Sequence, residues 1–238
     1  MDTLFNPLLF IGMGVLCAAL IYAAWRINGE RLFSAIIVFL ILITITGGKI
    51  VSFFGHETNV GNLFYASVFL ATYLLIERYG KRAGIRSIGL GVVFVAFVAL
   101  MLQMVVFVVG SGSSSGIDAA MTIVFGFSPR LAFASLSAYV CAQSINVFLY
   151  TKLRERWESR FVWLRANLAN AVAQIFDSII FFSVAFWGVV PPSNMLDSIT
   201  TGYLIKVLFM GLFAPLLYLN RVEEDEDGNG FLTLTFLR

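Results

Sequence analysis

Long apolar runs separated by short polar loops constrain this chain more than any other feature. A helix needs about 20 mostly apolar residues to cross the roughly 30 Å hydrocarbon core of a bilayer. Of the 238 residues, 59% are hydrophobic and 13% are charged, whereas about a quarter of the residues in soluble domains are charged. One soluble core of this size could not bury so much apolar surface. We therefore expect an all-α polytopic membrane protein.

Seven apolar segments are long enough to be membrane-spanning helices, although the third has only a short purely apolar part. The longest connection, at 111–129, contains a semi-apolar stretch, Ile117–Phe127, which we expect to lie at the interface or to re-enter the bilayer. Residues 1–221 would then form one transmembrane domain. The seven expected spans are Pro7–Trp25, Leu32–Phe54, Val60–Arg78, Ser87–Gly110, Arg130–Thr151, Val162–Trp187 and Asp197–Asn220.

Basic residues alternate between the loops. The loops at 26–31, 77–87 and 152–165 hold two, four and five Lys or Arg, whereas those at 55–61 and 188–196 hold none. Because Lys and Arg are enriched in cytoplasmic loops, we expect the N-terminus outside and the C-terminus in the cytoplasm. Residues 222–238 are expected to form a short acidic cytoplasmic tail. Since the basic residues sit in loops beside lipid, we expect no nucleic-acid partner.

Two ionisable residues lie deep within the expected spans. Asp177 is inside the sixth span, and Lys206 is near the middle of the seventh. Such residues are costly in lipid and are functional candidates by default. A buried ion pair that only fixes helix packing is the alternative, although such a pair rarely stabilises more than an apolar replacement. Lys49, toward the outer end of the second span, either is functional or snorkels to the interface.

A short polar motif occurs twice. Gln143 and Asn146 in the fifth span, and Gln174 and Asp177 in the sixth, are each spaced i and i+3, which places each pair on one helix face. The two spans run in opposite directions, so the polar faces could meet within the bilayer and bind a planar polar ligand. Inverted repeats with a site at the midplane recur in transporters. Polar contacts that only hold helices together are the alternative.

Further polar residues stand at span ends. Arg165 opens the sixth span and is followed by Asn167 and Asn170, which predicts a polar vestibule. Glu77 closes the third span beside several basic residues, where simple charge balance is the alternative to a functional role. Asn62 begins the third span and is expected to cap it.

Several kinds of chemistry are absent from the sequence. His56 is the single histidine, and Cys17 and Cys141 lie inside apolar runs. The chain has no GxxxxGK[ST] or HExxH motif, each of which carries a known chemistry. We therefore expect no metal site, no cofactor, no enzymatic activity and no nucleotide hydrolysis by this chain.

Short blocks of residues between Gly47 and Tyr218 form a recognisable set. They are 61–67 (GNLFYAS), 69–72 (FLAT), 77–81 (ERYGK), 128–130 (SPR), 163–165 (WLR) with Asn167, Gln174 and Asp177, 185–188 (AFWG) and 203–207 (YLIKV). In this set the chain resembles the queuosine precursor transporter family, also called the vitamin uptake transporter family, as a divergent member.

The resemblance implies a six-helix transporter core with one extra N-terminal helix. It also implies import of a queuosine precursor, a 7-deazaguanine-type base, or of a similar vitamin-like molecule. A guanine-like edge presents N1–H and an amine, which one carboxylate can accept as a pair. Asp177 is the candidate acceptor, and aromatic side chains such as Phe148 or Phe181 could stack on the base. The candidate substrate-binding residues are Asp177, Gln174, Gln143, Asn146, Lys206, Asn167, Arg165, Glu77, Asn62 and Tyr73.

Two positions depart from the family pattern. Tyr73 stands where the family usually carries an acidic residue, and Asn146 stands where it usually carries Asp. Tyr73 removes a carboxylate and adds a ring, whereas Asn146 keeps hydrogen bonding without the charge. The solute could therefore be related to, but different from, that of the family.

Other functions remain possible at this stage. The chain could be a substrate-binding membrane subunit that depends on a separate ATPase module, or it could carry an unrelated small polar solute. A receptor or structural role fits the helix count by analogy alone. Partners beyond the solute and the lipid bilayer, whether a second copy of the chain or an ATPase, stay undetermined.

Overall fold

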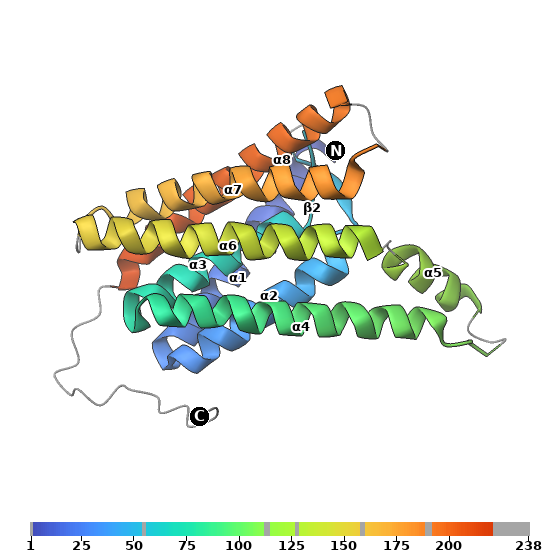
Figure 1. Cartoon of the computed structure of the whole chain (residues 1–238), viewed down its shortest axis with the longest axis horizontal. Coiled ribbons are helices and arrows are strands. Elements are labelled where there is room, and N and C mark those ends of the chain that lie inside the picture. Colours follow the sequence, from blue (N-terminus) through green and yellow to red (C-terminus); the bar gives the residue numbers. More distant parts are fainter. Residues whose placement is uncertain are drawn as a thin grey trace.

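The computed structural model describes residues 2–53, 56–111, 115–126, 129–157, 160–188 and 192–220 (Figure 1). The expected acidic tail at 222–238 lies outside these residues and stays a prediction. The elements in chain order are α1 (Asp2–Ile27), α2 (Gly29–Thr46), β1 (Ile50–Phe53), β2 (His56–Asn59), α3 (Gly61–Tyr79), α4 (Lys81–Phe107), α5 (Ser115–Phe125), α6 (Pro129–Trp157), α7 (Val162–Phe186), α8 (Pro192–Phe213) and a 3₁₀ helix, η2 (Ala214–Asn220).

Five described helices, α1, α2, α4, α6 and α7, are long and apolar enough to cross a membrane. This confirms a helical, multi-pass membrane protein, with five of the seven expected spans meeting both criteria. The other two are helices as well, but α3 is not among the candidates, and the apolar part of α8 with η2, Gly202–Tyr218, is shorter. That they also span the bilayer stays a prediction.

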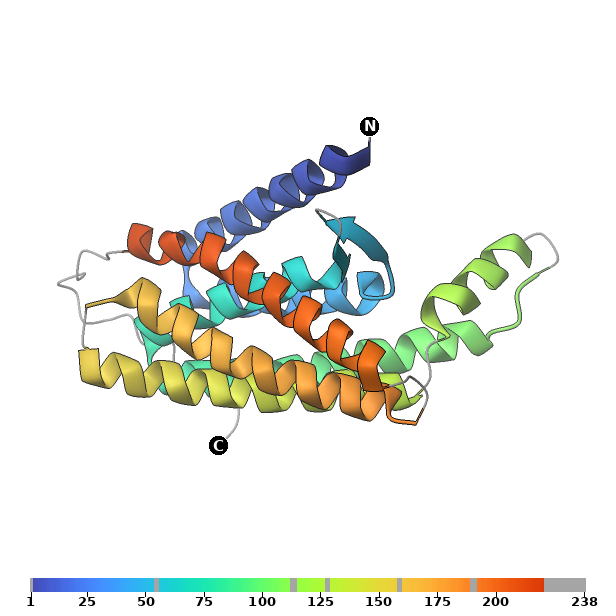
Figure 2. The same ribbon diagram turned by 90° about the horizontal axis from the view of Figure 1, so that it is seen from above.

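The central position of α3 explains its lower hydropathy. Every residue from Gly61 to Ile76 is buried, and α3 packs against α1, α2, α4, α6 and α8. Figure 2 shows α3 between α1 on one side and α6 on the other. A helix enclosed by other helices meets little lipid, so it can carry Tyr, Ser and Thr without exposing them to hydrocarbon.

The α6–α7 pair forms the most extensive helix contact of the described chain. The two helices run side by side and antiparallel (Figures 1 and 2). Small residues let helix backbones approach closely in membranes, and both helices carry rows of buried alanines. They are Ala134, Ala138 and Ala142 on α6 and Ala166, Ala169 and Ala173 on α7.

Arg130 holds the start of α6 against the end of α7. It lies in the first turn of α6 and donates from Nε to the Val184 carbonyl at 2.6 Å and from Nη2 to the Trp187 carbonyl at 2.7 Å. These carbonyls belong to the last turn of α7, where backbone acceptors lack helical partners. The start of α6 is therefore held to the end of α7.

The region after α2 differs from the sequence prediction. The expected span Leu32–Phe54 is wrong beyond Thr46, where α2 ends. Two consecutive glycines, Gly47 and Gly48, weaken the helix there, and Ile50–Phe53 pairs antiparallel with His56–Asn59. The fold is thus helical with one small hairpin, and Lys49 is exposed just before it.

The start of the fourth expected span was also misplaced. α4 begins at Lys81 rather than Ser87, directly after Gly80, whose φ of 76° lies in the left-handed region that glycine adopts without strain. Most of the semi-apolar stretch at 117–127 lies in a separate helix, α5. Its position relative to the bilayer stays a prediction.

The start of α3 is capped differently from the prediction. Oδ1 of Asn59, not Asn62, accepts the free backbone N–H of the first turn, which belongs to Asn62, at 2.9 Å. The Asn62 side chain instead donates to Thr58 Oγ1 at 2.9 Å. Asn62 is therefore buried within the hairpin–helix junction.

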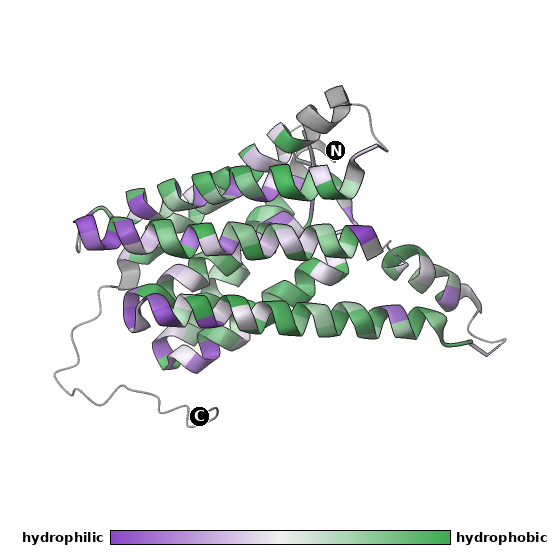
Figure 3. Ribbon diagram, in the orientation of Figure 1, coloured by the Kyte–Doolittle hydropathy of each residue, from purple (hydrophilic) through white to green (hydrophobic). Residues whose placement is uncertain are grey.

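Hydrophilic residues gather at one end of the bundle, where α4 begins, α6 ends and α7 begins (Figure 3). We call this the basic end; its exposed cations include Lys81, Arg82, Arg86, Lys152, Arg156 and Arg160. In contrast, the middle of α4 exposes large apolar side chains such as Val93, Phe97 and Leu100. This division is typical of a bundle whose sides meet lipid and whose ends meet water.

We predict that Ala173→Leu destabilises the protein, because a larger side chain cannot fit at a fully buried position of the α6–α7 region. Overpacking of this kind costs about 1–3 kcal/mol. Thermal unfolding of purified protein in detergent should show a lower midpoint. Val172→Leu, at the exposed neighbouring position, is the matched control and should leave the midpoint unchanged. Equal midpoints for the two variants would contradict the packing described.

Candidate functional site

Polar side chains from four helices form one continuous row inside the bundle, which we call the polar seam. On α3, Tyr65, Tyr73 and Glu77 lie on one face because they are separated by eight and four residues. From Tyr65 to Glu77 the seam extends about 18 Å along α3, at 1.5 Å per residue. The other members are Gln143, Asn146, Tyr150 and Arg154 on α6, Arg165, Asn170, Gln174, Asp177 and Ser178 on α7, and Lys206 on α8.

At one end of the seam, Asp177 binds two side chains. The Tyr65 hydroxyl donates to Oδ1 at 2.8 Å, and Lys206 Nζ donates to Oδ2. The side chains of Asp177 and Lys206 are only 7% and 12% exposed. Both residues were predicted as functional candidates, and the ion pair that the sequence left as an alternative is present. Asp177 therefore faces the protein interior and not lipid.

The next part of the seam carries amides from α6 and α7. The Tyr73 hydroxyl donates both to Asn146 Oδ1 at 2.6 Å and to the Ala166 carbonyl at 3.0 Å, so these two positions lie at one level. Because α6 and α7 are antiparallel, Gln143 and Asn170 share the next level. Both halves of the repeated motif thus face α3, Asn146 through Tyr73 and Asp177 through Tyr65; that the two halves meet each other stays a prediction.

Several buried polar atoms in this part have no hydrogen-bond partner among the described residues. They are Gln143 Nε2, Asn170 Nδ2, Gln174 Oε1 and Ser178 Oγ. The contacts of the amides with one another are long, Asn146 Nδ2 to Gln143 Oε1 and Gln174 Nε2 to Asn170 Oδ1, both at 3.3 Å. A buried polar atom without a partner costs about 1–3 kcal/mol, so such a cluster indicates a place where a polar guest or water belongs.

Tyr73 and Asn146 are the two departures from the family pattern, and they touch each other. Their hydrogen bond joins a hydroxyl to an amide, and the Tyr73 ring stacks on Tyr150 with centroids 4.4 Å apart. A neutral pair therefore occupies the place where the resemblance implies two acidic residues. The two substitutions are compatible because each supplies the partner of the other.

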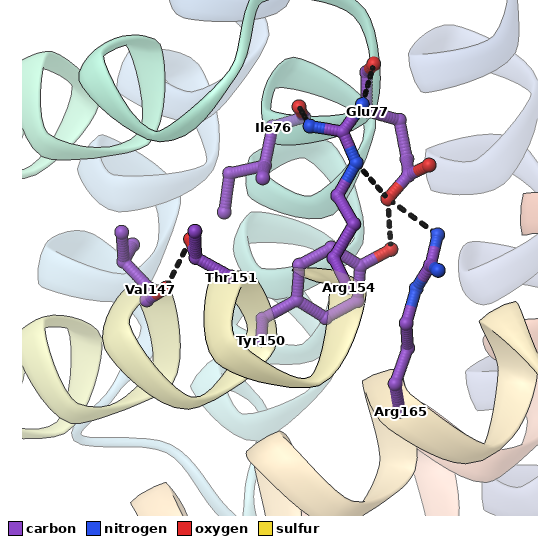
Figure 4. Close-up of polar contacts among 7 residues, drawn as sticks. All are labelled: Ile76, Glu77, Val147, Tyr150, Thr151, Arg154 and Arg165. Atoms are coloured by element: carbon purple, nitrogen blue, oxygen red, sulfur yellow. Dashed lines mark hydrogen bonds and ion pairs between the residues drawn. The ribbon is translucent and has the colours of Figure 1, made fainter. Parts of the chain in front are cut away.

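Glu77 closes the seam at the basic end (Figure 4). Its Oε1 accepts from the Tyr150 hydroxyl and from Arg165 Nη2, each at 2.7 Å, and lies 3.5 Å from Arg154 Nε. Arg154 also donates to the carbonyls of Ile76 and Glu77 at 3.0 Å, which satisfies the end of α3. The Arg165 side chain is fully buried, so this ion pair connects α3 with α7 inside the protein.

This arrangement corrects two interpretations of the sequence. Glu77 forms its ion pairs with arginines of α6 and α7, and not with its sequence neighbours. Arg165 does not line an open vestibule but reaches Glu77 under the ring of Tyr150, 5.3 Å from its centroid. In the described conformation the basic end of the seam is therefore closed.

Two predicted residues lie apart from the seam. Asn167 donates to the Trp163 carbonyl of its own helix at 2.9 Å and lies near Gly211 of α8, and Asn62 belongs to the hairpin junction. Phe148 is exposed on the outer face of α6, where Lys81 and Lys152 approach its ring. Phe181 packs edge-on against Phe182. The aromatic rings of the seam are instead tyrosines.

Sequence reasoning missed Tyr65, Tyr150, Arg154 and Ser178 as members of this site, and it used Asn170 only for a vestibule. The signal was present, because Gln143, Asn146, Tyr150 and Arg154 repeat at helical spacing on one face of α6. The same pattern joins the α3 residues through Phe69, whose ring lies 5.1 Å from that of Tyr65. Tyrosines in an apolar run look like core residues until their hydroxyl partners are known.

A groove of about 640 Å³ lies on the outer side of α6 and α7. Its lining includes exposed residues such as Leu168 and Val172 and none of the seam residues. The groove is therefore distinct from the seam.

The comparisons with known proteins point in one direction. A family model described as "Putative vitamin uptake transporter" matches residues 59–220. The chain is 34% identical over 171 residues to the "Probable queuosine precursor transporter" of Bacillus subtilis (strain 168), which covers 71% of this chain and 74% of that protein. It is 27% identical over 175 residues to the "Queuosine precursor transporter" of Escherichia coli (strain K12), with the same coverage of 71% and 74%.

A third relative, the "Probable queuosine precursor transporter" of Haemophilus influenzae, is 30% identical over 169 residues, with 68% of each chain covered. No solved structure shows a significant match. A multi-pass helical bundle with these relatives is a membrane transporter and not an enzyme. The chain belongs to the vitamin uptake transporter family, whose model covers α3 to η2 and thus the whole polar seam.

We predict that Glu77→Ala strongly destabilises the protein, because it removes the carboxylate that pairs with fully buried Arg165. Breaking a buried ion pair by removing one partner costs about 3–5 kcal/mol. Glu77→Gln, which keeps a hydrogen-bond acceptor, should cost less. Thermal unfolding in detergent checks the order, with Glu30→Ala at an exposed position of α2 as the control. A midpoint for Glu77→Ala equal to that of the control would show that the cluster is not a stabilising contact.

Proposed function

We propose that this chain imports a queuosine precursor, a 7-deazaguanine-type base, or a closely similar vitamin-like base across the cell membrane. The names of three relatives at 27–34% identity support this substrate class. The observation that carries the proposal is the polar seam itself, where a carboxylate lies beside amide and hydroxyl atoms that lack partners. These groups are shielded from lipid, as a solute pathway requires.

The chemistry of the seam suits a flat base. A guanine-like edge offers two parallel N–H donors, which a carboxylate accepts with charge assistance, and Asp177 supplies that carboxylate. Gln143 Nε2 and Asn170 Nδ2 are donors that could bind the ring carbonyl and ring nitrogens, and Gln174 Oε1 is a further acceptor. Tyr65 provides an aromatic face next to Asp177.

Import requires that the seam open alternately to the two sides of the membrane, because Arg165 near one end and Asp177 near the other are buried in the described conformation. We assign the Glu77 cluster as the gate at the basic end, since Arg154, Arg165 and Tyr150 close the seam there by contacts that link three helices. The surplus of Lys and Arg supports a cytoplasmic basic end. The N-terminus would then lie outside, the C-terminus in the cytoplasm, and residues 1–221 would act as one transport domain.

Uptake of radiolabelled 7-deazaguanine bases into liposomes that contain only the purified protein tests this function. Uptake by the pure chain would support a self-sufficient transporter, whereas binding without uptake would favour dependence on a separate ATPase module. Failure to bind any 7-deazaguanine base or purine, in protein that unfolds cooperatively, would reject the proposal.

We expect Asp177→Asn to weaken binding of the base, because the substitution removes the charge from the paired hydrogen bond. A hydrogen bond to a charged group contributes about 1.5–3 kcal/mol, so the Kd should rise by roughly one to two decades. Equilibrium binding of labelled base to purified protein is the measurement. Asp118→Asn on α5, away from the seam, is the control. An unchanged Kd for Asp177→Asn would exclude this carboxylate from the site.

We expect Ser178→Ala to separate binding from stability. Its hydroxyl is buried and has no described hydrogen-bond partner, so its removal should leave the thermal midpoint unchanged or higher. If the base uses this hydroxyl, the Kd should rise by about threefold to tenfold, the equivalent of roughly 0.5–1.5 kcal/mol. Ser144→Ala, at an exposed position of α6, should change neither quantity. A lower midpoint with an unchanged Kd would assign Ser178 to packing.

A further inference from the structure

Both carboxylate oxygens of Asp177 accept a hydrogen bond, whereas polar atoms of neighbouring residues have no described partner. Oδ1 accepts from Tyr65 and Oδ2 accepts from Lys206. Ser178, next to Asp177 in the sequence, Gln174, about one turn of α7 away, and Asn170, about two turns away, each have a buried polar atom without a described partner. A base that docks edge-on against both carboxylate oxygens therefore meets the hydroxyl and the ammonium already bound there, and competes with them for the carboxylate.

We propose that Lys206 is a built-in competitor for the solute: its ammonium occupies Asp177 when the seam is empty and is released when the base docks. The inference rests on the proposed function, because it concerns the same carboxylate. It assigns to Lys206 a role different from direct contact with the solute. The lysine neutralises Asp177 between transport events and gives up this place to the N–H donors of the base.

Lys206 is better suited to leave than Tyr65. Tyr65 lies on the enclosed helix α3, where its ring packs against Phe69 at 5.1 Å. Lys206 has a flexible four-carbon stem and the larger side-chain exposure of the ion pair, 12% against 7% for Asp177. Its Nζ also lies 5.4 Å from the centroid of the Tyr65 ring. That ring face attracts a cation and offers the ammonium a place after it leaves the carboxylate.

Displacement of Lys206 would also change how α8 is held. The ion pair ties the middle of α8 to α7. Space remains beside α8 at two glycines, because a Cβ at Gly202 would meet only Phe182 at 3.8 Å and one at Gly211 only Asn167 at 3.7 Å. Beyond Phe213, η2 stays attached to α7, where the Tyr218 hydroxyl accepts from the Trp163 backbone N–H at 3.4 Å. Solute binding would therefore free α8 at mid-bundle while its basic end stays attached.

Equilibrium binding of labelled 7-deazaguanine base to purified Lys206→Met protein tests the inference. A removed competitor predicts a Kd about tenfold or more below that of the wild-type protein, together with slower uptake into liposomes. A Kd raised about tenfold would make Lys206 a direct ligand of the base, and an unchanged Kd would make the ion pair purely structural. Either result overturns the proposal.

Further variants keep the test interpretable. Lys206→Arg retains a cation and should bind no more tightly than the wild type, whereas Lys49→Met, at an exposed position before the hairpin, should change nothing. If Lys206→Met does not fold, Lys206→Gln carries the same expectation of tighter binding. Wild-type protein that binds no base would overturn the proposed function and this inference together. Wild-type binding with no gain in the Lys206 variants would overturn this inference alone.

Discussion

The enclosure of α3 is the constraint on which the rest of the structure depends. Hydrocarbon offers no partner to a hydroxyl or a carboxylate, so a polar residue is tolerated within a span only where protein surrounds it. With α3 packed against α1, α2, α4, α6 and α8, Tyr65, Tyr73 and Glu77 point into protein. The polar contacts between Asp177 and Arg165 are possible because α3 is surrounded by other helices and does not face lipid.

Much of the fold could be predicted from the sequence, because hydropathy and loop charge report the bilayer directly. The failures have local causes. α2 ends at two glycines, after which β-branched residues pair with the segment that follows them, and an apolar run cannot distinguish that hairpin from a longer span. The cap that Asn59 provides at the start of α3 depends on a single side chain, and the early start of α4 depends on a single φ angle. Periodicity reveals neither.

The candidate site was predicted only in part. Spacing placed Gln143, Asn146, Gln174 and Asp177 on facing helices, and hydrophobic context marked Lys206, but no pattern could decide whether Asp177 and Lys206 form an ion pair. The partners of Glu77 could not be predicted either. Arg154 and Arg165 are far from it in the sequence and come close only because α6 and α7 pack beside α3 in the fold. The hydrogen bond between Tyr73 and Asn146 gives each of these two residues its partner, which spacing alone could not predict.

The alanine contact between α6 and α7 has a consequence for how the protein can move. The two helices pack against each other along their length, and Arg130 binds two carbonyls at one end of the pair. If the helices slid or separated, voids would open between them and the arginine would lose both acceptors. We therefore expect α6 and α7 to move together as one rigid body. Rearrangement during transport is then expected at the surfaces where this pair meets α3, α4 and α8, and those with α3 and α8 carry the charges.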